Sequence, residues 1–158
     1  MLERTVKQSN DLWNADLSEE SLIALGQWMA SNIEKRPLSP QEIAQIQDSL
    51  SYPFSMGGIQ VTDDITPLSY SIATDVGIYL GEVLKRNKPS LRWSQNLSNK
   101  NAMSYGEPLL TDSNSDLPQH KKVKCMPIST AISIAWRISE GKFDGSELHS
   151  FYKHWISK

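Results

Sequence analysis

Two acidic residues have the type and spacing that could do chemistry. Asp75 and Glu82 are seven residues apart, and on a helix this spacing places both carboxylates on one face, about 10 Å from each other. Such a pair could act as general acid and base, or could hold a lysine or arginine of a partner. Burying either carboxylate is costly without a cation, so Arg92 or Arg137 would be the expected counter-ion. The interpretation that we favour is a solvent-facing polar stripe made of Ser71, Thr74, Asp75, Glu82 and Lys85.

Other catalytic signals are sparse. The chain contains no glycine-rich phosphate loop, no nucleophile elbow and no H-E-x-x-H motif. His149 and His154 are five residues apart, about 140° around a helix axis, so they do not converge on one metal. Cys125 lies in a short apolar segment, where a lone cysteine is normally a small buried hydrophobe. We therefore predict no catalytic residue, no metal and no cofactor.

Two alternative functions use other residues. An enzyme of unrecognised type would combine Asp75 and Glu82 with His120 or Arg92 in a cleft beside the strands. A nucleic-acid-associated regulator would use the basic run 121–124, but no aromatic residues alternate with these lysines as base stacking requires. A solvated basic face is the favoured interpretation of this run.

The helix that carries Asp75 and Glu82 is predicted over residues 66–87. Thr66 is a suitable N-cap, and Pro67 takes the first helical position, where its missing N–H costs nothing. Each of the interior glycines Gly77 and Gly81 costs about 1 kcal/mol of helix propensity, so another element must pack against them. The apolar face consists of Leu68, Ile72, Val76, Tyr79, Leu80 and Val83. A helix that is apolar around most of its circumference is normally buried at the centre of a fold.

Further elements are predicted on both sides of this helix. Helices are expected over residues 2–14, 18–35 and 128–140, with another beginning at Pro40 and a last one capped by Asp144. Strands are expected at residues 59–62, 91–94, 102–105 and 122–126. The predicted fold class is α+β and helix-dominated, with a central buried helix, surrounding helices and a small antiparallel sheet.

Composition indicates one globular domain over residues 1–158. The chain is 39% apolar and 22% charged, which is ordinary for a globular protein. A single cysteine permits no internal disulfide and favours a cytoplasmic location. The N-terminus has no apolar leader, and no apolar run approaches the roughly 20 residues that span a bilayer. We therefore expect a cytoplasmic protein without a membrane segment.

The charge is unevenly distributed along the chain. The net charge of −2 argues against a dedicated nucleic-acid binder, which would carry a large basic surface. Residues 1–63 contain nine acids and four bases, a net charge of −5, whereas the remainder contains nine acids and twelve bases, a net charge of +3. An acidic region suits a basic partner, although surface helices also carry acids without any such role. The predicted partner-binding residues are Glu19, Glu20, Trp28, Glu34, Glu42 and Asp48.

Three short segments resemble a pattern found in small uncharacterised bacterial proteins. The segments are 77–82 (GIYLGE), 92–93 (RW) and 107–110 (EPLL). The resemblance implies a buried helix followed by a strand containing Trp and a second strand containing Pro and aliphatic residues. Some of these bacterial proteins are of the immunity-protein type, encoded beside toxins, and the resemblance implies no catalytic residue.

The function predicted from these observations is binding of another protein without catalysis. The partner would be a protein, for example a basic toxin that this chain neutralises as a bacterial immunity protein. Neither the oligomeric state nor the partner's identity follows from the sequence.

Overall fold

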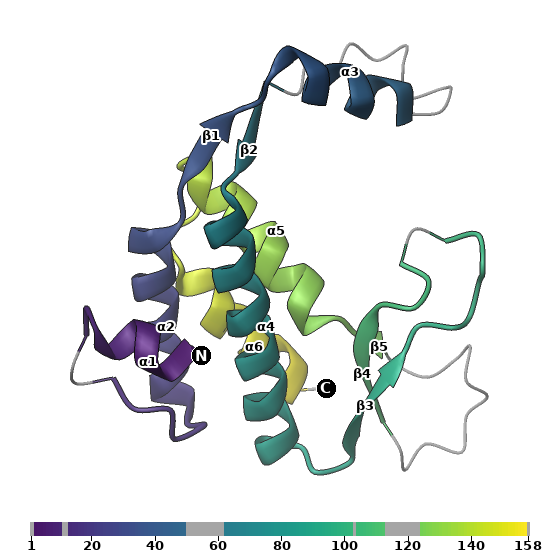
Figure 1. Cartoon of the computed structure of the whole chain (residues 1–158). Helices are drawn as coiled ribbons and strands as arrows, with labels where there is room; N and C mark the ends of the chain where they lie inside the picture. The colour runs from purple at the N-terminus through teal and green to yellow at the C-terminus, as the bar shows by residue number, and fades with distance from the viewer. Residues whose placement is uncertain (1, 11–12, 50–61, 103, 113–123, 158) are drawn as a thin grey trace.

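The computed structural model describes residues 2–10, 13–49, 62–102, 104–112 and 124–157. Over these residues the chain forms six helices, a two-stranded sheet and a three-stranded sheet, both antiparallel (Figure 1). The predicted helix-dominated α+β class is confirmed. No helix within the described ranges is both long and apolar enough to cross a membrane.

The central helix, α4 (Pro67–Asn87), forms as its sequence predicts. The Thr66 hydroxyl accepts a hydrogen bond from the Ser69 N–H at 3.2 Å and so caps the first turn. Most of its apolar face is buried. Leu68 is an exception, because its side chain is 66% exposed near the start of the helix. Ser71 and Ile78 are exposed as well, so one side of the helix faces solvent and the helix is not buried all round.

Four helices lie against or around α4. They are α1 (Leu2–Lys7), α2 (Glu19–Asn32), α5 (Pro127–Ser139) and α6 (Ser146–Ile156). Figure 1 shows α4 between α2 and α5, with α6 behind it. The predicted first helix is too long, because the Val6 carbonyl accepts hydrogen bonds from the Ser9 and Asn10 N–H groups and turns the chain after Lys7.

The two glycines of α4 lie where other elements approach its backbone. A Cβ added at Gly77 would lie 2.5 Å from the Ile128 Cα, at the start of α5. A Cβ added at Gly81 would collide with the indole ring of Trp93. Both glycines are buried, so the predicted close packing against this row is confirmed. The side of α4 that carries the two glycines is therefore covered by α5 and by Trp93.

A two-stranded arm extends from the end of the helix bundle. It consists of β1 (Lys35–Pro37) and β2 (Asp63–Ile65), and it carries α3 (Pro40–Ser49) away from the bundle (Figure 1). The chain leaves α2 earlier than predicted, since Ile33 is already extended with ψ of 124°. The strand predicted at 59–62 lies almost wholly outside the described residues.

The three-stranded sheet has the order β3-β4-β5. Its strands are β3 (Leu91–Gln95), β4 (Pro108–Asp112) and β5 (Lys124–Cys125). The strand predicted at 102–105 is wrong: the Ala102 carbonyl accepts the Tyr105 N–H at 2.9 Å, and Gly106 has φ of 83°, so this segment is a turn. Pro108 instead begins β4, a position in a strand that tolerates proline.

Candidate functional site

The outward stripe of α4 is the most distinctive described surface. Its residues follow at intervals of three or four, so they share one side of the helix. Ile78, near its middle, is 44% exposed although it belongs to a helix whose neighbouring positions are buried. The stripe consists of Leu68, Ser71, Asp75, Ile78 and Glu82.

A shallow groove of about 270 Å³ runs beside this stripe. One wall belongs to α4, and the other consists of Leu2 of α1 and Leu17, which lies two residues before α2. The groove is lined by Leu2, Leu17, Asp75, Ile78, Tyr79 and Glu82. The structure therefore brings Asp75 and Glu82 to one site, between apolar walls.

Tyr79 joins the two walls through its hydroxyl. The Leu17 N–H donates to the Tyr79 Oη at 3.0 Å, and the Ser21 Oγ lies 2.8 Å from the same oxygen. Because the Ser21 hydroxyl donates its single proton to the Ser18 carbonyl at 2.7 Å, Tyr79 must donate to Ser21. Leu17 has φ of 60°, a left-handed conformation that costs a leucine about 1 kcal/mol or more. The hydrogen bond from its N–H offsets part of that cost and places its side chain at the groove.

Glu82 is held by two donors of the chain itself. The Trp93 indole N–H donates to Oε1 at 2.7 Å, and the Lys85 Nζ lies 3.0 Å from both carboxylate oxygens. Partial burial would raise the pKa of Glu82, but the hydrogen bonds from Trp93 and Lys85 prevail and lower it below its usual value. A carboxylate held ionised in this way is a poor general acid, so its role is to position Trp93 over Gly81.

Asp75 differs from Glu82 because its carboxylate has no partner among the residues that the structure describes. It is half-buried in the wall of the groove. Within the described part of the chain, no group donates a hydrogen bond to this carboxylate or forms an ion pair with it. Asp75 therefore remains available to a cation that the described chain does not supply.

Arg92 does not join the two acids. Alternate residues of a strand point to opposite sides, and Trp93 is the residue of β3 that contacts α4. The exposed Arg92 guanidinium instead donates to the Leu91 carbonyl at 2.8 Å and to the Pro89 carbonyl. Arg137 lies over the Phe143 ring, 5.4 Å from its centroid. Neither arginine is the counter-ion that the sequence suggests.

Two residues of the predicted acidic face are engaged within the chain. The Glu19 Oε1 lies 2.6 Å from the His149 Nε2 and 2.7 Å from the Lys153 Nζ, both on α6. Glu42 binds both terminal nitrogens of Arg36, at 3.1 and 2.6 Å, and accepts the Ser39 N–H at 2.9 Å. These hydrogen bonds lower the pKa of Glu42 to about 2, with the Arg36 contribution the largest. The Ser39–Glu42 capping box is thus present and is joined to β1.

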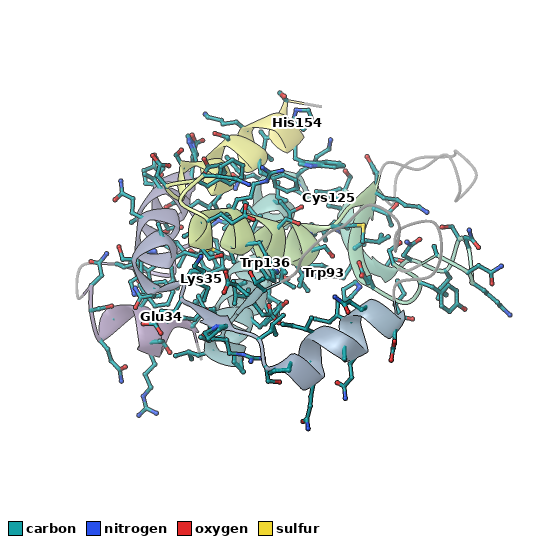
Figure 2. All side chains as sticks on the ribbon, turned by 90° about the horizontal axis from the view of Figure 1, so that it is seen from above. Glu34, Lys35, Trp93, Cys125, Trp136 and His154 are labelled. Atoms are coloured by element: carbon teal, nitrogen blue, oxygen red, sulfur yellow. The ribbon has the colours of Figure 1, made fainter. Side chains whose placement is uncertain are left out.

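The other predicted partner-binding residues lie far apart. Trp28 is only 6% exposed, and its indole N–H donates to the Ser9 Oγ at 2.7 Å. Glu20, Glu34 and Asp48 are exposed and, among the described residues, form no side-chain ion pair. Glu20 lies in the first turn of α2, whereas Glu34 follows the end of that helix at the base of the arm (Figure 2). At 1.5 Å per residue the two acids are about 20 Å apart. Because Asp48 is on α3, these acids do not form one continuous face.

The remaining candidates give no catalytic centre within the described ranges. His120 and residues 121–123 lie outside them, and the Lys124 ammonium donates to the Ser98 Oγ at 2.9 Å. Cys125 is fully buried in the sheet, as expected for a small hydrophobe (Figure 2). No group of three or more metal-ligating side chains was found in this part of the chain.

The sequence pointed to two of the six residues that line the groove, Asp75 and Glu82, and not to the other four. Ile78 could have been recognised, because it lies one turn from Asp75 and outside the predicted apolar face. The hydrophobic pattern of their helices indicates that Leu2 and Tyr79 are core residues, and both lie at the edge of the core. Leu17 carries no local signal, since its left-handed backbone depends on the distant Tyr79 hydroxyl.

Comparison of this chain with protein-family models, with curated proteins and with solved structures found no match.

Proposed function

We propose that this chain is a non-enzymatic protein-binding protein, of the kind represented by bacterial immunity proteins that neutralise a toxin. The observation that carries the proposal is the groove on α4, where the exposed Ile78 lies one helical turn from Asp75, a carboxylate that no described residue pairs with. Exposed apolar side chains beside a charge that lacks an internal partner are typical of a surface that another protein covers.

The charge distribution supports a basic partner. Three ion pairs of the acidic region, Glu3–Lys7, Lys35–Asp63 and Arg36–Glu42, join residues that both belong to it. These three pairs bring in no cation from outside the region, whose net charge is −5; the Glu19–Lys153 pair is the described ion pair that does. A region of this charge accelerates and orients the approach of a basic protein even where individual acids make no contact.

The contacts of three other acids, Glu19, Glu42 and Glu82, also favour binding over catalysis. Glu19 and Glu42 are held in ion pairs that join elements of the fold. Glu82 is held by Lys85 of its own helix and by the indole N–H of Trp93 in β3. Each of the three has a lowered pKa, and general acid catalysis at neutral pH requires the opposite shift. These groups stabilise the surface rather than react at it.

The direct test is co-expression of the chain with proteins encoded beside its gene, combined with affinity capture of the tagged chain. We expect one neighbouring product to inhibit growth when expressed alone, to lose that effect in the presence of this chain, and to copurify with it. An equally expressed, unrelated tagged protein is the control. Capture of no protein, together with no protection from any neighbouring product, would contradict the proposal.

A further inference from the structure

We infer that the groove on α4 receives a short amphipathic helix of a basic partner protein, with a lysine or arginine of that helix bound to Asp75. The inference rests on the proposed protein-binding function and specifies the chemistry of the partner. It is carried by the charge of the groove, by its apolar walls and by the length of the stripe.

The charge of the groove is concentrated on Asp75. Both carboxylates line the groove, but Glu82 is already bound by Lys85 and Trp93. Arg86, which follows Lys85 on α4, does not bind Asp75 either, because its guanidinium donates to the Asp16 carbonyl at 2.7 Å. Of the two carboxylates that line the groove, Asp75 is therefore the one that no described cation binds, and it is half-buried. A partner's ammonium or guanidinium group would compensate it.

The walls determine what must accompany that cation. Leu2, Leu17 and Ile78 surround the carboxylates with apolar surface. Apolar walls lower the effective dielectric constant, so an ion pair formed between them is stronger than one in open solvent. They also bind apolar side chains directly. The complementary segment thus carries a lysine or arginine next to a large apolar residue.

The stripe indicates that this segment is helical. It continues from the groove through the small Ser71 to Leu68, the most exposed of the large apolar side chains described. From Leu68 to Ile78 the helix rises about 15 Å, or roughly three turns. A helix laid along α4 would place one apolar residue on Leu68 and another on Ile78, with its cation beside the latter. Repeated anchors of this kind are characteristic of helix-in-groove recognition.

The first test uses a defined probe. A model peptide of about 14 residues, long enough to form a marginal helix, is built from leucine and lysine, and its counterpart replaces each lysine with glutamate. We expect the lysine peptide to bind and the glutamate peptide not to bind. Asp75→Asn and Ile78→Ser should each weaken binding of the lysine peptide by about tenfold, the size expected of a central interface residue.

Matched controls are present on the same molecule. Asp48→Asn removes an exposed acid of α3 that has no partner among the described residues, and Ile23→Ser removes an isoleucine of α2 that is 42% exposed, close to the 44% of Ile78. We expect both controls to retain wild-type affinity, within about twofold. Thermal unfolding of all four variants verifies that they fold, and Asp75→Glu should restore most of the affinity because it restores the charge.

Three results would overturn the inference. They are unchanged peptide affinity in folded groove variants, equal losses in groove and control variants, and a dimer of the chain itself that Ile78→Ser dissociates. A natural partner that binds Asp75→Asn and Ile78→Ser as tightly as the wild type would overturn it as well, while leaving the protein-binding function intact. Absence of any partner for the wild-type chain would instead contradict the proposed function.

Discussion

Tyr79 contributes to the groove through a hydroxyl group that the hydrophobic pattern of its helix conceals. Its ring lies in the core against Trp13, with 5.4 Å between the ring centroids. Its hydroxyl binds the Leu17 N–H and the Ser21 Oγ, which positions the chain before α2. A residue can thus belong to the core by its ring and to the surface architecture by one polar atom.

Tyr79→Phe should separate these two roles. The substitution keeps the ring but leaves the Leu17 N–H without its acceptor, so we expect a loss of about 1–2 kcal/mol in the free energy of unfolding. Urea denaturation provides the measurement, and Tyr105→Phe, at a tyrosine that is 41% exposed, is the control. If Tyr79→Phe were as stable as Tyr105→Phe, the hydroxyl would not hold this wall of the groove.

At the scale of elements, α4 is positioned by what covers its two glycines. The start of α5 contacts Gly77 through backbone atoms, whereas Trp93 covers Gly81 with a side chain. Trp93 is in turn oriented by its hydrogen bond to Glu82. Figure 2 shows Trp93 between the sheet and the helices, so one side chain connects the two layers.

Gly77→Ala should destabilise the protein despite the higher helix propensity of alanine. That propensity favours alanine by about 1 kcal/mol, but a Cβ at this position lies 2.5 Å from the Ile128 Cα, and backbone cannot move aside easily. We expect a net loss of about 2 kcal/mol, in the range of overpacked cores.

Gly81→Ala should cost less than Gly77→Ala, because a side chain can rotate away. Thermal and urea unfolding of both variants gives the comparison, with Ser71→Ala on the exposed stripe of α4 as the control for propensity. A Gly77→Ala protein more stable than the wild type would show that α5 does not pack closely here.

Considered as a whole, the molecule consists of a helix bundle with two appendages. The sheet is attached to α4 and α5 at one end, and the arm carries α3 at the other (Figure 1). Within the described residues α3 has no extensive contact with another helix, and Arg36 and Glu42 join it to β1. The stability of α3 should therefore depend on that ion pair much more than the stability of the bundle does.

This dependence gives a prediction for pH. The pKa of Glu42 in the folded chain is about 2, below its ordinary value of 4.5. A lowered pKa stabilises the folded form fully above about 4.5 and loses its effect as the pH falls toward 2. We expect the backbone amides of α3 to lose protection from hydrogen exchange over this range before those of α4 do.

Arg36→Gln is the matched variant. It should raise the pKa of Glu42 toward its ordinary value and should deprotect α3 at neutral pH, with α4 unchanged. An NMR titration of the Glu42 carboxyl measures its pKa, and hydrogen exchange followed by NMR measures the protection of α3 and α4. Lys7→Gln, which removes the exposed Glu3–Lys7 pair, is the control. Simultaneous loss of protection in α3 and α4 would show that the arm and the bundle unfold as one unit.

Local signals were sufficient for most elements and insufficient for the site. The caps at Ser18 and Thr66 and the Ser39–Glu42 box act within four residues, so the helices that they begin could be predicted closely. The strand predicted near residue 105 is instead a turn closed by local hydrogen bonds, such as the Tyr105 N–H to the Ala102 carbonyl. A bond between separated residues, from the Gly106 N–H to the Asn96 carbonyl, is added to them.

The sequence by itself determined where the helices capped by Ser18, Ser39 and Thr66 begin, because such a cap acts within one turn. It also indicated that Gly77 and Gly81 would be covered, because each glycine costs helix propensity that packing must return. Only the tertiary structure decided which acids remain available to a partner. Glu19 is bound by His149, 130 positions away, and Glu82 is bound by Trp93, whereas Asp75 has no described partner. The reason is physical: a helix cap is completed within one turn, but an ion pair between distant segments forms only where the packing of the whole core brings them together.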